Sequence, residues 1–474
     1  MFLDIDKKPA AAIAAIDDSG ERVTYGELAG AACYVSGLLP PRELVFCLCE
    51  NRAGALAGYI ALYQNKDVPL LLDAAADKEL LRLLMELYGP SYLWLPERMA
   101  GEFPVEAVGS YKGFVLAKTP YNAPKMHDGL SFLLSTSGST GTPKLVRHRY
   151  GNLEANARAV AGIFGWDARE RGICHLPIQY TMGLNVINSH LYAGAAVLLT
   201  KSSLTSSAFW DFISEQKGTN FTGVPYSYEI LFKLRFMKRE LPYLRTLASG
   251  GGKLPEDRFA ALAEYAAGTG RRFFSTFGTT ETSARMAFLP PEMAMLKVGS
   301  IGRAIPGGEL WLLDDSGSVI GNTEAEGELC CSGPNVTMGY ANSRGDLSRG
   351  DELNGVYHTG DIARRDRDGC YYIIGRRQRF LKLFGHRVSL EQCEMLIGAE
   401  FASDCACIGS DPCAGSGERM KIFLTDQSIA EQVRAFLSEK TGLPRSVFSV
   451  SALDEIPRNQ SGKIDYPELK ELNT

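Results

Sequence analysis

Hydrophobic and polar positions follow two periodicities along the first three hundred residues. Residues 44–49, LVFCLC, form a short run without a polar interruption, which is typical of a strand buried on both faces. The segment 53–63, rich in Ala and Leu, predicts a helix, and residues 68–72 predict the next strand. The same strand and helix signals return in three later segments: 195–200, 210–232 and 256–277. Strands that alternate with helices indicate an α/β fold with parallel sheets.

Local signals mark where elements begin and where their type changes. Thr24 and Glu27 form a capping-box pattern that predicts the start of an amphipathic helix, after a strand and turn in residues 9–20. After about residue 307, strand and turn patterns dominate and predict a small β-rich subdomain. A charged helix is predicted at 428–440. We expect a domain boundary near residue 377, where a predicted strand ends, giving domains 1–377 and 378–474.

Length and composition limit the classes of protein that fit. The chain has 474 residues, 45% of them hydrophobic and 22% charged, which predicts a globular protein of two or three domains. The net charge of −5 lacks the basic field that nucleic-acid binding usually needs. No run approaches the roughly 20 apolar residues of a membrane span. Asp4 and Asp6 stand where a signal peptide would be basic, so we expect a soluble, cytoplasmic protein.

The cysteines and histidines do not form a metal-binding pattern. The chain has 11 cysteines and 6 histidines, without Cys-x-x-Cys or His-x-x-x-His spacing. Pairs such as Cys47 with Cys49 and Cys330 with Cys331 lie in strand-like contexts, which favours a role as small core residues.

The segment 135–144, STSGSTGTPK, carries the clearest chemical signal. It follows the apolar run 131–134 and holds hydroxyl and glycine residues without interruption up to Pro143. Glycines let backbone N–H groups approach an anion, hydroxyls add neutral donors, and Lys144 adds a positive charge. It is not a Walker A loop, because Lys144 follows Thr-Pro. The alternative is a surface loop, but the pattern favours phosphate binding.

This segment resembles the signature of the adenylate-forming superfamily, which includes acyl- and aryl-CoA synthetases, luciferase and the adenylation domains of peptide synthetases. Further motifs follow in the superfamily's order. They are the segments Phe277–Glu281 (FGTTE), Gly299–Arg303 (GSIGR), Gly327–Leu329 (GEL), Tyr357–Asp361 (YHTGD), Gly375–Arg376 (GR) and Pro457–Lys463 (PRNQSGK). The resemblance covers essentially the whole chain.

The resemblance implies a fold and a reaction. The implied fold is α/β, with a large N-terminal domain of two α/β subdomains plus a β-rich subdomain, and a small mobile α+β C-terminal domain. The implied reaction joins a carboxylic acid to ATP, giving acyl-AMP and pyrophosphate, and then transfers the acyl group to a phosphopantetheine thiol. The expected cofactors are ATP and Mg²⁺, with coenzyme A or a carrier-protein thiol as co-substrate.

The resemblance also implies roles for single residues. Catalysis is expected from Lys463, Glu281 and Thr280, and Glu281 is expected to bind Mg²⁺. Lys463 would neutralise charge on the α-phosphate during adenylation. Contacts with the nucleotide are expected from Thr136, Ser137, Gly138, Ser139, Thr140, Gly141, Lys144, Gly251, Thr279, Asp361 and Arg376. Taken alone, an Asp after Thr-Gly is usually a turn residue, and Lys463 would be a solvated lysine.

Some positions depart from the superfamily pattern. Gln378 and Arg379 stand where two acids usually follow the Gly-Arg pair, and the first of these positions, Gln378, is the expected hinge. A hinge needs a permissive backbone more than a charge. Leu145 replaces the usual glycine after Lys144, and Tyr150 stands in place of a histidine.

The carboxylic acid is expected to bind near residues 175–183, 224–227 and 249–253. The residues expected to contact it are Tyr180, Thr181, Met182, Tyr226 and Gly252. Members that activate amino acids place Asp at the position of Thr181, so an acid without an α-amine is favoured. The aromatic and Met side chains favour an apolar or aromatic acid, although each could simply pack in the core.

Other functions and two thiol acceptors stay open. A non-catalytic nucleotide-binding descendant, an amino-acid-activating ligase and a kinase or ATPase are the alternatives. A carrier protein is narrowly favoured over coenzyme A, because Leu390 replaces a proline that is frequent in members using coenzyme A. Residues 361–387 hold seven Arg and one Lys against three Asp, and these cations suit either acceptor. No nucleic-acid partner is expected.

Overall fold

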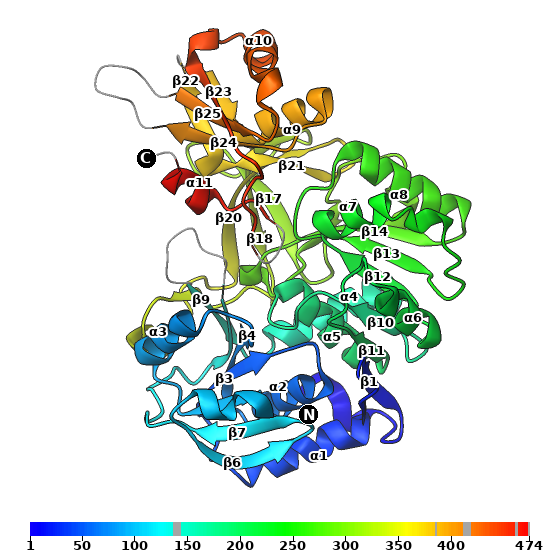
Figure 1. The fold of residues 1–474 in the computed structure, drawn as a ribbon, viewed down its shortest axis with the longest axis vertical. Helices are drawn as coiled ribbons and strands as arrows, with labels where there is room; N and C mark the ends of the chain where they lie inside the picture. Colours follow the sequence, from blue (N-terminus) through cyan, green and yellow to red (C-terminus); the bar gives the residue numbers. More distant parts are fainter. Residues whose placement is uncertain (136–143, 384–385, 411–418, 460–462, 473–474) are drawn as a thin grey trace. The chain divides into compact units, whose positions relative to one another are not determined.

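The computed structural model describes residues 1–135, 144–383, 386–410, 419–459 and 463–472 (Figure 1). The chain forms two compact units: the first combines residues 1–310 with 331–357, and the second combines 311–330 with 358–474. Each unit combines two separate segments of the chain, so this division does not test a single boundary. The expected boundary at residue 377 stays a prediction.

One large sheet of the first unit contains nine strands of the described chain. They are β1 (Ile13–Asp17), β2 (Arg22–Thr24), β10 (Arg171–Cys174), β11 (Ala196–Leu199), β12 (Asn220–Gly223), β13 (Thr246–Ser249), β14 (Arg272–Phe277), β15 (Ala287–Leu289) and β16 (Arg303–Ala304). Their order is β16-β15-β14-β13-β12-β10-β11-β1-β2. The strands from β14 to β1 in this order are parallel, and β2, β15 and β16 pair antiparallel at the two edges.

The other large sheet of this unit contains eight described strands. They are β3 (Leu44–Cys49), β4 (Val68–Asp73), β5 (Tyr92–Pro96), β6 (Glu106–Tyr111), β7 (Phe114–Lys118), β8 (Leu130–Ser135), β9 (Leu145–Arg149) and β19 (Tyr340–Ala341). Their order is β19-β9-β8-β4-β3-β5-β7-β6, with parallel pairing among β8, β4, β3 and β5. The parallel pairing confirms the interpretation of residues 44–49 and 68–72 as buried strands.

Helices cover and separate these sheets. They are α1 (Tyr25–Ser36), α2 (Ala53–Gln64), α3 (Lys78–Tyr88), α4 (Asn152–Phe164), α5 (Thr181–Ala193), α6 (Ser207–Glu215), α7 (Pro225–Lys233) and α8 (Glu256–Gly268). The predicted capping box is present at the start of α1. The Glu27 N–H donates to the Thr24 hydroxyl at 3.1 Å, and the Thr24 N–H donates to the Glu27 carboxylate at 2.8 Å.

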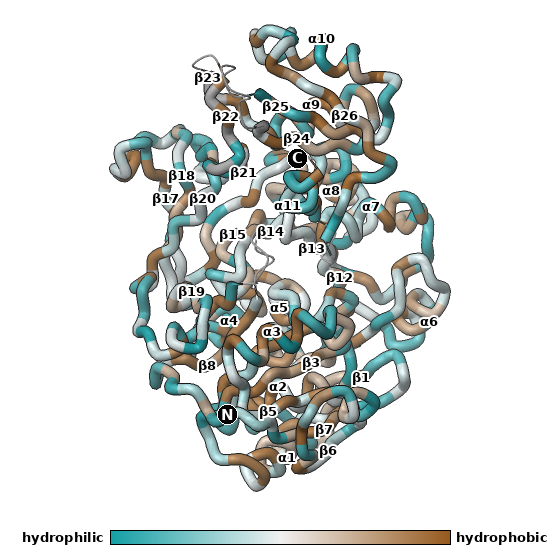
Figure 2. The backbone as a smooth tube through the Cα atoms, turned by 60° about the vertical axis from the view of Figure 1, so that its left-hand side comes forward, coloured by the Kyte–Doolittle hydropathy of each residue, from teal (hydrophilic) through white to brown (hydrophobic). Residues whose placement is uncertain are grey.

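A single apolar core joins the two large sheets through the helices between them. It includes side chains from β1, β3, β11, α1, α2 and α5. Helix α2 is buried along its whole length up to Tyr63, which agrees with its lack of polar residues before Gln64. Figure 2 shows hydrophobic residues in α2 and in the strands beside it. Burial on both sides holds the ends of the parallel strands in a fixed register.

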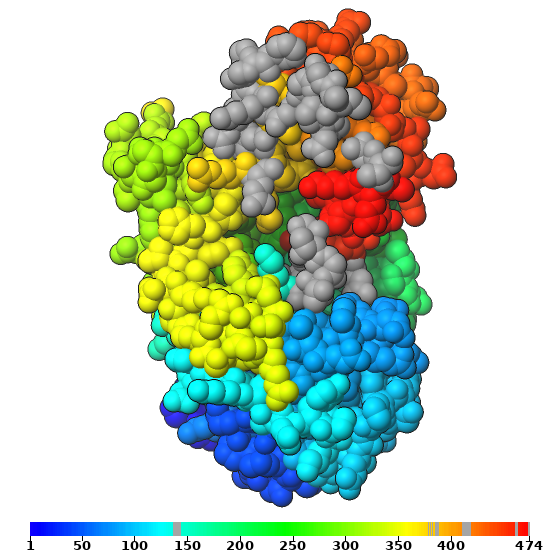
Figure 3. All heavy atoms as spheres, turned by 90° about the vertical axis from the view of Figure 1, so that its left-hand side faces the viewer, coloured from blue at the N-terminus to red at the C-terminus, as the bar shows by residue number. Residues whose placement is uncertain are grey.

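The second unit contains a sheet of four described strands and a smaller α+β assembly. The sheet has the order β17-β18-β20-β21, with bounds β17 (Glu309–Leu313), β18 (Ala325–Ser332), β20 (Val356–Arg365) and β21 (Tyr371–Arg376). The remaining elements are β22 (Phe380–Leu383), β23 (His386–Ser389), α9 (Leu390–Phe401), β24 (Cys405–Ser410), β25 (Arg419–Leu424), α10 (Ala430–Thr441), β26 (Phe448–Ala452) and α11 (Tyr466–Glu471). These elements confirm the β-rich segment after residue 307 and the predicted charged helix. Helix α11 forms part of this unit's surface (Figure 3).

Candidate active site

Most of the acid- and nucleotide-binding residues predicted in the first unit follow the carboxyl ends of neighbouring parallel strands. Tyr180 follows β10, Tyr226 follows β12, Gly251 follows β13 and Thr280 follows β14. The register of these strands is even, with Gly223 opposite Ser249 and Ser249 opposite Ser275. Ligands of α/β sheets bind at the carboxyl ends of their strands. The fold therefore brings these sequence-distant segments to one edge of the sheet.

A strained turn presents Thr280 and Glu281 after β14. The Thr279 N–H donates to the Thr282 hydroxyl at 3.1 Å, and the Thr280 hydroxyl lies 2.9 Å from that of Thr181. Beyond the turn, Ala284 has a φ of 113°, which L-residues rarely adopt. A Cβ on Gly278 would lie 1.5 Å from the Ala284 carbonyl oxygen, so only glycine fits there. These contacts thus hold the backbone in one strained conformation around Thr280 and Glu281, the two residues predicted to be catalytic.

Tyr340 connects Glu281 with Lys144. Its hydroxyl donates to Glu281 Oε1 at 2.6 Å, and the Lys144 Nζ lies 6.0 Å from the centre of its ring. Glu281 is only 9% exposed, and its backbone carbonyl accepts a hydrogen bond from the Thr337 N–H at 2.9 Å. This contact of Tyr340 could not be predicted from the sequence, because no motif spacing relates residue 340 to residue 281.

Arg147, a fully buried residue of β9, holds the backbone that carries Tyr340. Its guanidinium donates to the carbonyl of Tyr340 at 3.0 Å, of Met338 at 3.1 Å and of Arg349 at 2.5 Å. It also forms an ion pair with Glu352 at 2.6 Å. A buried guanidinium needs such partners. Arg147 follows Lys144 by three residues, so it fixes the Tyr340 segment beside the strand that leaves the predicted phosphate loop.

The arrangement is compatible with a Mg²⁺ ion carried by a nucleotide. Mg²⁺ is usually held by one or two carboxylates together with substrate phosphates. Glu281 provides one such carboxylate, and the described residues include no cluster of three or more metal-binding side chains. Glu281 would hold the ion, which would neutralise charge on the phosphates.

An apolar wall lies beside these polar groups. Leu176, Met182 and Val224 are buried together, with the partly buried Tyr180 packed against them. Gly251 has a φ of 76°, and a Cβ there would lie 2.7 Å from the Tyr180 hydroxyl. Burial raises the pKa of Tyr180 to about 12, so its phenol stays neutral. The structure thus brings together Tyr180, Met182 and Gly251.

Two other residues predicted to contact the acid are placed less centrally. A Cβ on Gly252 would lie 3.1 Å from the Pro225 ring, so this glycine allows the segment after β13 to approach the start of α7. Tyr226, the second residue of α7, is 45% exposed and is not part of the buried apolar wall.

In the second unit, Asp361 and Arg376 lie opposite each other on β20 and β21. Arg376 Nε is 3.3 Å from Asp361 Oδ1. The Asp361 side chain is almost fully buried, whereas that of Arg376 is 61% exposed. Lys463 is exposed, and its N–H donates to the Asn459 side chain at 3.1 Å. Gln378 lies in a short 3-10 turn, Arg377–Arg379.

The remaining predicted nucleotide ligands lie outside the described residues. They are Thr136, Ser137, Gly138, Ser139, Thr140 and Gly141. Their assigned contacts stay predictions, as do the roles assigned to the other site residues.

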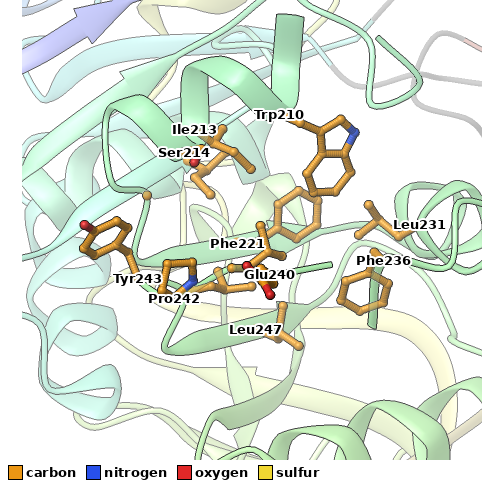
Figure 4. A pocket seen from close by; sticks show the side chains of 14 residues that line it. Trp210, Ile213, Ser214, Phe221, Leu231, Phe236, Glu240, Pro242, Tyr243 and Leu247 are labelled. Atoms are coloured by element: carbon orange, nitrogen blue, oxygen red, sulfur yellow. The ribbon is translucent and has the colours of Figure 1, made fainter. Parts of the chain in front are cut away.

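The first unit also contains an apolar pocket (Figure 4). Phe221, Leu231, Phe236 and Leu247 point into it, with Trp210 at its edge. None of the residues predicted to contact the acid lines this pocket. The chemistry described above therefore lies elsewhere.

Comparison with known proteins agrees with this geometry. Residues 4–341 match the family model described as AMP-binding enzyme. A 2-succinylbenzoate–CoA ligase of Bacillus velezensis is 31% identical over 355 residues, which cover 73% of this chain and 69% of the relative. A 2-succinylbenzoate–CoA ligase of a Geobacillus species is 26% identical over 386 residues, covering 80% and 76%.

Solved structures share the fold along nearly the whole chain. The o-succinylbenzoate CoA synthetase MenE of Bacillus subtilis, in complex with its acyl-adenylate, has a TM-score of 0.80 at 23% identity, covering 99% of this chain and 97% of that one. ATP-bound MatB of Rhodopseudomonas palustris has a TM-score of 0.79 at 23% identity, covering 100% and 99%.

The chain therefore belongs to the AMP-binding enzyme family. The resemblance to the adenylate-forming superfamily and the predicted fold class are confirmed. Among the described helices, none has the length and the apolar character that crossing a membrane requires.

Proposed function

We propose that this protein is an AMP-forming acid–thiol ligase. It activates a carboxylic acid with ATP and Mg²⁺ to acyl-AMP and pyrophosphate, and then transfers the acyl group to a thiol. The observation that carries the proposal is the group of Glu281, Tyr340 and Lys144 in a chain of the AMP-binding family. A carboxylate fixed at a strand end beside a lysine suits a metal-bound triphosphate.

The acid is proposed to be apolar or aromatic and to lack an α-amine. Leu176, Met182 and Val224 offer an apolar surface beside Tyr180, and no carboxylate stands at position 181. The Thr181 hydroxyl, 2.9 Å from that of Thr280, cannot compensate an ammonium charge. The relatives named for 2-succinylbenzoate, an aromatic acid, support an aryl substrate.

Coenzyme A is proposed as the thiol acceptor, because the curated relatives are CoA ligases. The preference for a carrier protein stays a prediction, and the structure weakens its basis. Leu390 is only 5% exposed and packs in the core around α9, so it is not available to contact a partner. Among the cations, Arg377 is paired with Glu328 at 2.7 Å, and Arg379 lies inside its own unit.

A cytoplasmic location belongs to the same proposal. The ten cysteines in the described parts of the chain form no disulfide, and nine of them are buried. Unbridged thiols suit a reducing compartment.

The test is pyrophosphate exchange with ATP over a panel of carboxylic acids. The panel should hold 2-succinylbenzoate, benzoates, straight-chain fatty acids and amino acids. We expect exchange with aryl or apolar acids, and AMP as the product once coenzyme A is added. ADP would indicate a kinase or ATPase, and exchange only with amino acids would indicate the amino-acid-activating class. Nucleotide binding without any product would indicate a non-catalytic descendant.

A further inference from the structure

Arg379 lies in a small closed cluster of the second unit, directly after Gln378. Its side chain is 13% exposed, and its Nη2 donates to Glu394 Oε1 at 2.7 Å and to the Cys407 carbonyl at 3.2 Å. Its Cζ lies 3.7 Å from the centre of the Tyr466 ring. The Tyr466 hydroxyl donates to both oxygens of the same carboxylate, at 3.2 and 3.1 Å. The cluster thus joins the start of the C-terminal region to α9 and α11.

The cluster depends on the positive charge of the Arg379 guanidinium. Burial raises the pKa of the Glu394 carboxyl, and the Arg379 guanidinium partly offsets that rise. The Cys407 N–H adds a further bond to this carboxylate at 2.6 Å. The superfamily pattern places an acid at position 379, and an acid there would face Glu394 and repel it. The arginine of this chain instead attracts both Glu394 and Tyr466.

Tyr466 lies three residues after Lys463 and begins α11. The loop that carries Lys463 is closed at its base by backbone contacts. The Asn459 N–H donates to the Lys463 carbonyl at 2.8 Å, and the Asp465 N–H donates to the Pro457 carbonyl at 2.8 Å. Residues 458 and 464 form an isolated β-bridge. A displacement of Tyr466 would therefore be transmitted to the base of this loop.

We infer that Arg379 is a positioning residue for Lys463. Arg379 directly follows the expected hinge, and its side chain holds the base of the Lys463 loop through Glu394 and Tyr466. Lys463 therefore keeps its position relative to residue 379. This inference rests on the proposed function, in which Lys463 serves the adenylation step. Arg379 does not touch the reacting groups and acts only through the loop.

The test compares R379Q, the double variant R379Q/E394Q and the control R434Q. Arg434 forms a surface ion pair with Glu431 at 2.7 Å on α10, so the control loses an arginine of the same unit away from the loop. R379Q leaves a buried carboxylate without its cation and should lower the melting temperature. The double variant removes that carboxylate charge and should recover most of the loss.

Adenylation should remain low in the double variant, because Tyr466 has lost the cation over its ring. We expect kcat for pyrophosphate exchange to fall roughly tenfold or more in both Arg379 variants, since misplaced groups cost rates of that order. The KM for ATP and thioester formation from supplied acyl-AMP should stay close to wild type. R434Q should match wild type throughout. Wild-type adenylation in the folded double variant would overturn the inference, because Arg379 would then serve only as a charge partner.

A second measurement does not depend on activity. Hydrogen exchange at the amides of Lys463 and Asp465, followed by mass spectrometry, should be faster in both Arg379 variants than in wild type and R434Q. Unchanged exchange at these amides would also overturn the inference. Failure of the proposed function has a different signature, because wild type itself would then show no pyrophosphate exchange with any acid.

Discussion

Replacing Tyr340 by Phe removes one hydroxyl from the candidate active site and leaves its ring in place. The lost interaction is the 2.6 Å hydrogen bond to Glu281. A hydrogen bond to a charged group contributes about 1.5–3 kcal/mol. Glu281 is 9% exposed, so water replaces the hydroxyl poorly. Since 1.36 kcal/mol corresponds to a factor of ten, the rate of acyl-AMP formation at low Mg²⁺ should fall by about ten- to hundredfold.

The assay is pyrophosphate exchange measured across a Mg²⁺ titration. The Mg²⁺ concentration for half-maximal exchange should rise in Y340F, because the Glu281 carboxylate is no longer held. Tyr88 offers a matched control, since its buried hydroxyl donates to the carbonyl of Ala341 at 3.0 Å, and Ala341 is the residue directly after Tyr340. Y88F should cost about 1 kcal/mol of stability and leave the Mg²⁺ dependence unchanged. Equal Mg²⁺ curves for Y340F and wild type would refute this role of Tyr340.

Three further substitutions test other parts of the account. K463A should abolish acyl-AMP formation and leave thioester formation from supplied acyl-AMP nearly intact; an equal loss in both half-reactions, measured separately, would contradict the role of Lys463 in adenylation alone. Q378D should leave adenylation little changed and alter the thiol step, and identical rates in both steps would mean that the departure at the hinge has no mechanistic effect. G251A places a Cβ 2.7 Å from the Tyr180 hydroxyl at a φ of 76°. It should cost about 1–2 kcal/mol of stability and raise the KM for the acid, and a wild-type melting curve and KM would contradict this.

Local patterns of the sequence were sufficient for the elements, and several residues that they assign to the first-unit site lie close together in the structure. The run at 44–49 is a buried parallel strand because it lacks any polar residue, and the Thr24–Glu27 capping box forms as expected. Thr280 and Thr181 were both assigned to the site from motif positions, and their hydroxyls lie 2.9 Å apart. These motif positions come together because parallel strands bring their carboxyl ends to one edge of the sheet.

Features that depend on long-range packing could not be predicted in this way. Tyr340 reaches Glu281 only because β19 pairs with β9, a contact between segments far apart in the sequence. Arg379 is one of the cations in 361–387 that the sequence suggests for meeting a thiol acceptor, whereas the folded chain buries it against Glu394. The division of the chain into compact units is discontinuous as well, because the chain enters the second unit at 311, leaves it after 330 and returns at 358. A one-dimensional pattern contains no signal for such a return.

The proposed function requires that the chain joins a carboxylic acid to AMP. The most direct measurement is ATP–pyrophosphate exchange by the purified protein with and without 2-succinylbenzoate and related aryl or apolar acids. We expect exchange that requires both Mg²⁺ and one of these acids, and that disappears in K463A. Exchange that is absent with every acid, or that proceeds equally without any acid, would contradict it.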